Sequence, residues 1–467
     1  MNIKRKLQKL EVVLVFTFIA LYSLAALLVS LHRYWQYNAF WYDFGIFDET
    51  VWKLSKFQLP IIPNLNPPLG RIVWADHFNP SIITLTPFYW ITDKSEVILV
   101  AQVIFVALSA IVAYLIALKK VKNSLVRISL ISSYLGFVGM QNALYTDVHN
   151  IVFALLPLMV TFWAIYQKNW KVFWFFLVLT FGFQENMTGV GLGLGLFLLL
   201  RKEKQKKVGV LTILISILYG ALTTKVLIPF FRESSYAYIP EIPTVWHQWI
   251  TRFFIPLEMK LKSIFLTFTT FGFLPLASFA TIPLIVEHYL ERFVLNTAAT
   301  RWDLGFHYNA LLSPIMFIAS LEVICKIQNC IKLEKFLPIW AFTNILIVVF
   351  LHRFYLHGPL MLATHPVFYE QTMRAKFLDK FISQIPTNGL LMTQNNLATR
   401  FTHKNTILLN KNYEEIKPDI IAVDKRPGQN ANNFFPITPD GFEAIIASLS
   451  ANRNYLKKSI TDSQFVF

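Results

Sequence analysis

The stretch of sequence that decides the fold class is residues 12–31, which read VVLVFTFIALYSLAALLVSL. A helix rises about 1.5 Å per residue and the hydrocarbon core of a bilayer is about 30 Å thick, so this uncharged run is long enough to cross it once. The run is also longer than the apolar part of a signal peptide, and no small-residue cleavage site follows it. We therefore predict a retained first membrane span.

The rest of the chain repeats this apolar pattern. Hydrophobic residues make up 55% of the 467 residues and charged residues only 15%, whereas soluble domains carry roughly 25% charged residues. The region 261–289 is apolar but interrupted by Gly272, Pro275 and Pro283, and we interpret it as two short spans. The other candidate spans lie at about 96–117, 124–140, 151–166, 172–186, 187–200, 208–231, 308–325 and 337–352. We predict a mainly α-helical, polytopic bundle of about 11 transmembrane spans.

The charge distribution predicts the orientation of this bundle. The chain has 43 Lys and Arg residues against 27 Asp and Glu, a net charge of +16. The basic residues gather in short gaps between the apolar runs, as the positive-inside rule requires, so we expect no nucleic-acid partner. With a cytoplasmic N-terminus, the inner gaps are 1–11, 118–127, 167–171, 201–208 and 326–336. An odd number of spans then places the C-terminal tail outside, whereas a single span at 261–289 would place it inside. We expect a multi-pass plasma-membrane protein with an extracytoplasmic tail.

The tail differs in composition from the rest of the chain. Residues 390–393 and 420–423 have the apolar character of short buried strands. Residues 367–384 and 439–452 have helical spacing. We predict a transmembrane domain over 1–352, with an outer loop at 33–95, and a small extracytoplasmic α/β domain over 353–467.

The outer loop 33–95 carries the densest polar signal. Residues 41–52 read WYDFGIFDETVW and place three carboxylates among large aromatic residues, which is typical of a helix at the membrane interface. A carboxylate pressed into such a surface has a raised pKa, which suits a general base. Asp43 and Asp48 are therefore the candidate catalytic residues. Two structural alternatives remain open: Asp43 caps a short helix, or Glu49 pairs with Lys53 one turn later.

A second polar motif follows in the same loop. Residues 74–80 read WADHFNP, in which Asp76 and His77 either orient each other or bind a metal or phosphate. A structural hydrogen bond of His77 is the alternative. Asn79 and Pro80 predict the start of a second interfacial helix. The remaining substrate-binding candidates stand at other outer ends of the spans: Asp147, His149, Glu185, Arg292, Arg301 and His307. Their common sidedness matters because a pocket needs convergent polar groups.

Glycines alternate in one predicted span, at positions 189, 191, 193 and 195. The run lies inside an apolar helix and lacks the strand-then-helix context of a phosphate-binding loop. Small residues on one helix face let a neighbouring helix approach closely. We therefore predict close helix packing at this run.

Five motifs together resemble an uncharacterised family of prokaryotic membrane proteins known as domain of unknown function 2079. Residues 43–52 resemble its D-L-G-I-F-D-Q-x-x-W, residues 76–80 its D-H-F-S-P, residues 147–149 its D-F-H, and residues 305–310 its G-F-H-Y-x-A. Gln184, Glu185 and Asn186 stand where the family has K-E-D. The chain keeps one carboxylate there and loses a cation and an acid, which puts donor-phosphate binding by this motif in doubt.

The layout of that family is similar to the GT-C superfamily of membrane glycosyltransferases. The resemblance implies a first-loop carboxylate that acts as base or metal ligand, and a sugar donor linked to a polyprenyl phosphate. Asp43 would deprotonate the acceptor hydroxyl, while Asp48 would orient the acceptor or, like His77, hold a divalent cation. No cofactor is certain on this interpretation. His77, His149 and His307 would bind the donor, and Arg292 or Arg301 would neutralise the leaving phosphate.

Two other classes of function compete with the glycosyltransferase. A transporter or lipid flippase also carries ionisable groups at membrane depth and broken spans. However, the polar groups here are expected at one face and no inverted repeat is visible. The other alternative is a non-catalytic assembly or sensor protein whose tail is the functional part.

Overall fold

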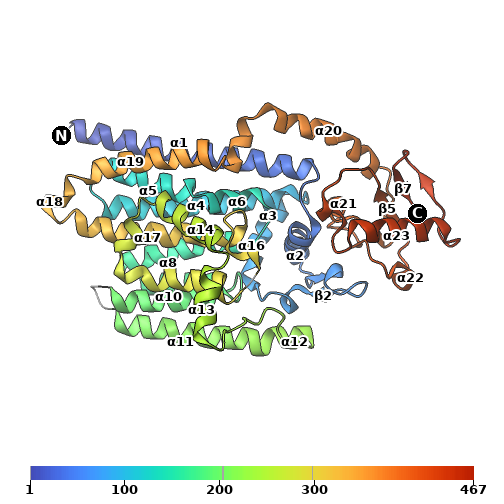
Figure 1. Cartoon of the computed structure of the whole chain (residues 1–467), viewed down its shortest axis with the longest axis horizontal. Helices are drawn as coiled ribbons and strands as arrows, with labels where there is room; N and C mark the ends of the chain where they lie inside the picture. The colour runs from blue at the N-terminus through green and yellow to red at the C-terminus, as the bar shows by residue number, and fades with distance from the viewer. Residues whose placement is uncertain (1, 202–204, 297) are drawn as a thin grey trace. The chain divides into compact units, whose positions relative to one another are not determined.

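The computed structural model describes residues 2–201, 205–296 and 298–467 (Figure 1). Part of the predicted basic gap 201–208, namely 202–204, lies outside the described residues. The chain forms two compact units. The helical unit comprises Met1–Val29, His77–Ser81 and Gln102–Ala363, and the mixed unit comprises Ser30–Asp76, Ile82–Ala101 and Thr364–Phe467. The domain division predicted after residue 352 stays a prediction.

Apolar helices dominate the described chain. Six are long and apolar enough to cross a membrane, at 8–35, 96–120, 150–167, 206–232, 299–327 and 331–355, and two shorter ones lie at 170–181 and 187–200. They include α1 (Asn2–Trp35), α4 (Glu96–Lys120), α8 (Leu155–Gln167), α9 (Trp170–Phe181), α10 (Met187–Leu200), α11 (Lys206–Leu222), α17 (Leu312–Ile327) and α19 (Leu337–Phe350). Figure 1 shows α10 and α11 side by side. The predicted mainly α-helical, polytopic fold is confirmed.

Some predicted spans are broken into shorter helices. The run 124–140 divides at Phe137, whose extended backbone separates α5 (Ser124–Gly136) from α6 (Val138–Tyr145). The region 261–289 divides as expected, into α14 (Leu257–Thr270) and α15 (Ile282–Tyr289), with Gly272 in a left-handed conformation between them. These breaks explain why fewer described helices than the expected 11 spans are long enough to cross a bilayer alone.

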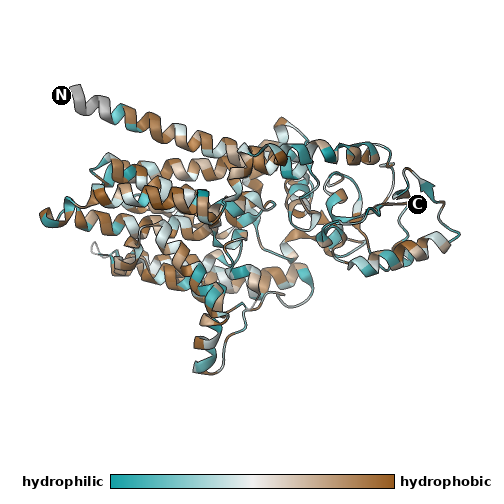
Figure 2. Cartoon of the chain, turned by 45° about the horizontal axis from the view of Figure 1, so that its top comes forward, coloured by the Kyte–Doolittle hydropathy of each residue, from teal (hydrophilic) through white to brown (hydrophobic). Residues whose placement is uncertain are grey.

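Hydrophobic residues, coloured brown in Figure 2, recur along the helices of the helical unit. On α11 the side chains of Leu211, Leu214, Ile217 and Leu218 are exposed. Such a continuous apolar surface is costly in water and suits contact with lipid tails. The chain is a membrane protein.

The alternating glycines of α10 allow two neighbouring helices to approach closely. A Cβ atom at Gly195 would lie 2.8 Å from the carbonyl oxygen of Gly209 in α11. A Cβ atom at Gly193 would lie 3.0 Å from the Cα atom of Leu284 in α15. Both neighbours are backbone atoms, so the packing depends on the missing side chains, as predicted.

The mixed unit contains a five-stranded sheet in the order β4-β3-β5-β7-β6. Its strands are β3 (Leu391–Thr393), β4 (Thr406–Leu408), β5 (Ile420–Asp424), β6 (Lys458–Ser459) and β7 (Gln464–Val466). β3 runs parallel to β4 and β5, whereas β7 is antiparallel to β5. The predicted α/β character of the tail is confirmed.

Helices cover both faces of this sheet because successive side chains of a strand point to opposite faces. Ile421 and Val423 of β5 pack in one core with the apolar residues of α23 (Pro439–Ala451). Ile420 and Ala422 pack in another core with those of α20 (Pro366–Ile382). Residues 420–423 of β5 are therefore apolar on both faces, as the sequence indicated, and the strand ends at Asp424.

The outer-loop part of the mixed unit is mostly helical. The predicted interfacial helix at 41–52 begins later, as α2 (Ile46–Ser55), because Trp41–Gly45 form a wider π-helical turn. The second predicted helix begins with a 3₁₀ turn (Pro80–Leu85) and continues as α3 (Thr86–Ile91). A short hairpin of β1 (Ile61–Ile62) and β2 (Arg71–Ile72) lies between α2 and α3 in the sequence.

Candidate functional site

The helical unit contains a cavity of about 780 Å³. One part of its wall is apolar and comes from α10, α15 and their neighbours: Leu192, Leu196, Val286 and Leu290. The other part is polar and charged: His77, Glu185, Glu287, Glu291, Arg292 and Arg301. Four of the predicted substrate-binding residues thus line one cavity, and its two-part wall suits a ligand with an apolar chain and a charged head.

Arg292 is a buried basic residue in this wall. It lies in the π-helical turn Leu290–Val294 that follows α15, and only 1% of the residue is exposed. Its Nη1 atom lies 3.4 Å from Oε1 of Glu291. Its buried Nε and Nη2 atoms have no hydrogen-bond partner among the described residues. A buried donor without a partner is costly, so these N–H groups favour binding of an anion.

Arg301 adds a second guanidinium on the same side. Its Cζ atom lies 4.2 Å from the centre of the Tyr308 ring, and the Cζ atom of Arg292 lies 5.2 Å from the same centre. Both contacts are of the cation–π type. Tyr308 therefore keeps two positive charges together beside the cavity without neutralising them.

Glu185 organises a second polar group in the lining of the cavity. It lies in the turn between α9 and α10, and its Oε1 atom accepts a hydrogen bond from the Tyr236 hydroxyl (2.6 Å) and contacts Nδ1 of His77 (2.7 Å). Its Oε2 atom accepts a hydrogen bond from the Phe78 N–H (3.1 Å). Burial alone would raise the pKa of Glu185, but His77 and these hydrogen bonds bring it below its usual value. Glu185 is therefore an anion that holds His77 at the cavity wall.

Two further predicted histidines form a stacked pair. The ring centres of His149 and His307 lie 3.3 Å apart, with an angle of 18° between the rings. Burial lowers the pKa of His149 to about 3, so this imidazole is neutral at physiological pH. His307 also interacts electrostatically with Arg292 and Arg301. Asp147, two residues before His149 in the sequence, is buried, and its backbone carbonyl accepts a hydrogen bond from Gln102 (3.3 Å).

Asp48 belongs to the mixed unit and is fully buried there. It accepts hydrogen bonds from the hydroxyl groups of Tyr89 and Thr402. Its Oδ2 atom lies 3.1 Å from Nε2 of His403, whose ring stacks on Trp52 at 4.6 Å. This arrangement favours a structural role for Asp48, because each carboxylate oxygen already has a partner.

A metal site does not fit the residues that the sequence analysis suggested for it. Asp48 already contacts two hydroxyl donors and an imidazole, and none of these three neighbours is a second carboxylate. His77 is held by Glu185 through Nδ1. Within residues 2–201, 205–296 and 298–467, no group of three or more His, Cys, Asp or Glu side chains is placed to hold a metal ion.

The other acids of the outer loop lie in different environments. Asp43 is exposed on the turn Trp41–Gly45, and Asp76 is partly buried after a 3₁₀ turn. Glu49 forms an ion pair with Lys53 at 2.6 Å, so that alternative is confirmed. Burial raises the pKa of Glu49 to about 7, although Lys53 opposes the shift. The raised pKa expected for this loop therefore belongs to Glu49, which was not a catalytic candidate.

Several residues of these networks were not predicted from the sequence. Tyr236 and Tyr238 come from the segment after α12 (Ile228–Arg232), and the ring of Tyr238 stacks on His77 at 4.7 Å. The two tyrosines, close together at 236 and 238, were the one sequence feature that could have indicated their role. No sequence feature indicated Thr402 and His403, because they lie far from Asp48 along the chain.

Comparison with known proteins gives a family and a fold. The family model described as "Predicted membrane protein (DUF2079)" matches residues 33–457. No curated protein matches the sequence. The structure is similar to the crystal structure of ArnT from Cupriavidus metallidurans bound to undecaprenyl phosphate, with a TM-score of 0.55 and 10% sequence identity over 96% of this chain and 97% of that chain. ArnT is a GT-C glycosyltransferase, and the likeness shows that this chain has the GT-C fold.

Proposed function

Because the chain belongs to the DUF2079 family of predicted membrane proteins and has the GT-C fold, we propose that it is a membrane glycosyltransferase. The donor is a sugar linked to a polyprenyl phosphate, and transfer takes place at the outer face of the membrane. The basic inner gaps of the sequence support a cytoplasmic N-terminus and an extracytoplasmic tail.

The observation that carries this proposal is the two-part wall of the cavity. A polyprenyl chain needs an apolar surface within membrane-spanning helices, which Leu192, Leu196 and Val286 supply. Its phosphate needs N–H donors, and the Nε and Nη2 atoms of Arg292 are buried donors without a partner among the described residues. Charge-assisted hydrogen bonds to phosphate are among the stronger polar interactions in proteins. The ArnT structure was solved with a ligand of this class, undecaprenyl phosphate.

The proposed reaction is a displacement at the anomeric carbon of the donor. The acceptor oxygen forms the new bond to this carbon, and the bond from the carbon to the phosphate oxygen breaks. The phosphate leaves with the bonding electrons, and Arg292 and Arg301 stabilise its developing charge. The proton of the acceptor hydroxyl passes to a general base, and the sequence makes Asp43, in the mixed unit, the candidate for this role. Glu185 keeps His77 oriented toward the bound donor.

The donor site is tested by the binding of undecaprenyl phosphate to the full chain in nanodiscs. Replacing Arg292 by Gln removes the buried charge, and hydrogen bonds to charged groups contribute about 1.5–3 kcal/mol each. We expect the Kd to rise about tenfold or more, since about 1.4 kcal/mol corresponds to a factor of ten. Arg374→Gln is the control, because Arg374 is an exposed arginine of α20. An unchanged Kd in Arg292→Gln contradicts the donor site.

The base is tested separately with Asp43→Asn. Asp43 is exposed, so this change leaves the core intact. We expect loss of sugar transfer from a labelled polyprenyl-phosphate donor with unchanged binding of undecaprenyl phosphate. Full transfer by Asp43→Asn removes Asp43 as the base.

A lipid flippase would use the same two-part cavity. Sealed vesicles distinguish the two functions, because a flippase moves labelled undecaprenyl phosphate between leaflets without covalent change. Movement without any transfer would replace the glycosyltransferase proposal.

A further inference from the structure

The sheet of the mixed unit has a topological switch point. β3 lies between β4 and β5, so the chain leaves β3 toward one side and later returns to the other side. In α/β sheets, ligands bind outside the carboxyl ends of the parallel strands where the chain changes sides. Here this edge is formed by the residues after β3, from Gln394 onward, and by the loop 425–435 after β5.

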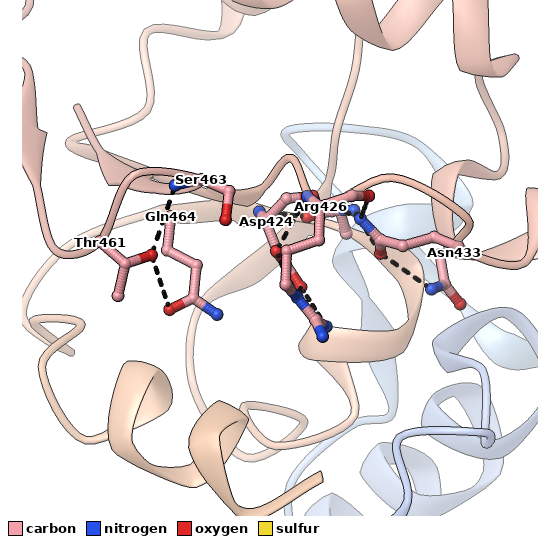
Figure 3. A network of polar contacts seen from close by, with 8 residues as sticks. Asp424, Arg426, Asn433, Thr461, Ser463 and Gln464 are labelled. Atoms are coloured by element: carbon pink, nitrogen blue, oxygen red, sulfur yellow. Dashed lines mark hydrogen bonds and ion pairs between the residues drawn. The ribbon is translucent and has the colours of Figure 1, made fainter. Parts of the chain in front are cut away.

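A partly buried polar network links the two loops at this edge, and Figure 3 shows its part around Asp424, Arg426 and Asn433. Gln394 accepts a hydrogen bond from the Asp424 N–H (2.5 Å). Gln429 donates to the carbonyl of Asp424 (2.8 Å) and accepts a hydrogen bond from the Asn433 side chain (3.0 Å). Arg426 forms an ion pair with Asp424 at 2.6 Å. These groups satisfy one another, so they form a rigid support and leave ligand contacts to the residues above them.

The turn that carries Asp43 packs on this support within the mixed unit. The Tyr42 N–H donates to Oδ1 of Asn395 (3.1 Å), and the Asn395 side-chain amide donates to the carbonyl of Asn432 (2.9 Å). The rings of Tyr42 and Phe435 meet edge to face, with their centres 4.6 Å apart. Asn395 thus links the outer-loop turn to the loop after β5.

The turn exposes only two of its side chains. Trp41 and Phe44 are fully buried, and a Cβ atom at position 45 would lie 2.4 Å from the Trp41 ring, so only glycine fits there. Tyr42 and Asp43 remain exposed, as do Asn432 and Phe435 beside them. The result is a surface with two aromatic rings, a carboxylate and an amide.

We propose that Tyr42, Asp43, Asn432 and Phe435 form a carbohydrate-binding surface that holds the acceptor sugar. Aromatic rings offer flat apolar faces to the C–H faces of a sugar ring at little entropic cost. The carboxylate accepts hydrogen bonds from hydroxyl groups, and the amide both accepts and donates them. The inference rests on the proposed transfer in one respect: it brings an acceptor hydroxyl to Asp43, the proposed base.

Saturation-transfer NMR on the full chain in nanodiscs tests this surface without a lipid donor. The probes are free glucose, galactose, mannose and N-acetylglucosamine. We expect saturation of the ring protons of at least one sugar, and at least a fivefold loss of this signal in Tyr42→Ala and in Phe435→Ala. Phe57→Ala is the control, since Phe57 is a 92% exposed aromatic residue of the same unit. It should leave the signal unchanged.

The outcomes separate this inference from the proposed function. Absence of any sugar signal in the wild type, or a signal that persists in both aromatic variants, overturns the carbohydrate surface. Both variants replace exposed side chains, and their circular dichroism should match that of the wild type. A Tyr42-dependent sugar signal together with an Arg292→Gln variant that binds undecaprenyl phosphate normally supports the surface and refutes the donor site.

Discussion

Replacing Glu185 by Gln should destabilise the polar end of the cavity. The two side chains have the same shape, so the amide oxygen can take the position of Oε1 and keep the contacts with Tyr236 and His77. The amide NH₂ then occupies the position of Oε2, where it faces the Phe78 N–H that was 3.1 Å away. Two donors oppose each other there, and the Phe78 N–H loses its acceptor.

The size of the effect follows from these contacts. A buried donor left without a partner costs about 1–3 kcal/mol, and loss of charge assistance weakens the other two bonds by about 1 kcal/mol in total. We expect the free energy of unfolding to fall by about 3 kcal/mol, or about a hundredfold in the equilibrium constant. Reversible unfolding in mixed detergent and SDS micelles measures this difference.

Acidification provides a second readout for Glu185. Its pKa is lowered in the folded state, so its contribution to stability is present above its ordinary pKa of 4.5 and is lost as the pH falls through the lower folded value. The difference between wild type and variant should therefore shrink in acid. Glu334→Gln, at an exposed position of α18 (Ile331–Glu334), is the control. A Glu185→Gln protein within about 0.5 kcal/mol of wild type at neutral pH refutes the reasoning.

Three further substitutions test other parts of the structure. Burial raises the pKa of Glu49 from 4.5 to about 7, so its contribution to folding stability is complete below about pH 4.5 and is lost as the pH rises through 7. Glu49→Gln should therefore remove about 3 kcal/mol of the pH dependence of stability. Thermal unfolding between pH 5 and 8 measures this change. Gly195→Ala should lower the free energy of unfolding by about 1–3 kcal/mol, because the new methyl group would lie against the backbone of α11. Gly220→Ala should cost less, because its nearest neighbour is a side-chain hydroxyl at 3.1 Å. Equal losses of the two variants in SDS unfolding would contradict the packing argument. Asp48→Ala should lower the free energy of unfolding by about 3–5 kcal/mol, because its three partners stay buried without their acceptor. Limited proteolysis should then cleave the tail faster than in the wild type. A tail as resistant as in the wild type would argue against the network.

The membrane-spanning part of the fold was largely predictable from the sequence. Long apolar runs such as 12–31 and 97–117 lie in α1 and α4, because a span of the bilayer requires a continuous apolar segment. The strands β4 and β7 were missed for the opposite reason. Each pairs with a strand in another segment of the chain, β4 with β3 and β7 with β5, and no local pattern marks this pairing.

The site was predictable where the evidence was local. The ion pair of Glu49 and Lys53 follows from their spacing. Glu185 and Arg292, which the predicted spans place on one side, line the same cavity. The contact of Asp48 with Thr402 could not be predicted from local spacing, because Thr402 lies 354 residues later. Tyr236 likewise lies in a segment with no periodicity, and only the folded chain brings it to Glu185.

The Asp48 network has a consequence for the biosynthesis of the protein. Chains are made at roughly 5–20 residues per second, so Asp48 leaves the ribosome about 20–70 seconds before Thr402 and His403 exist. During this interval the outer loop cannot bury its carboxylate with these two partners. A chain that stops before residue 402 lacks both of these partners of Asp48. The network thus couples the stability of an early segment to the completion of translation.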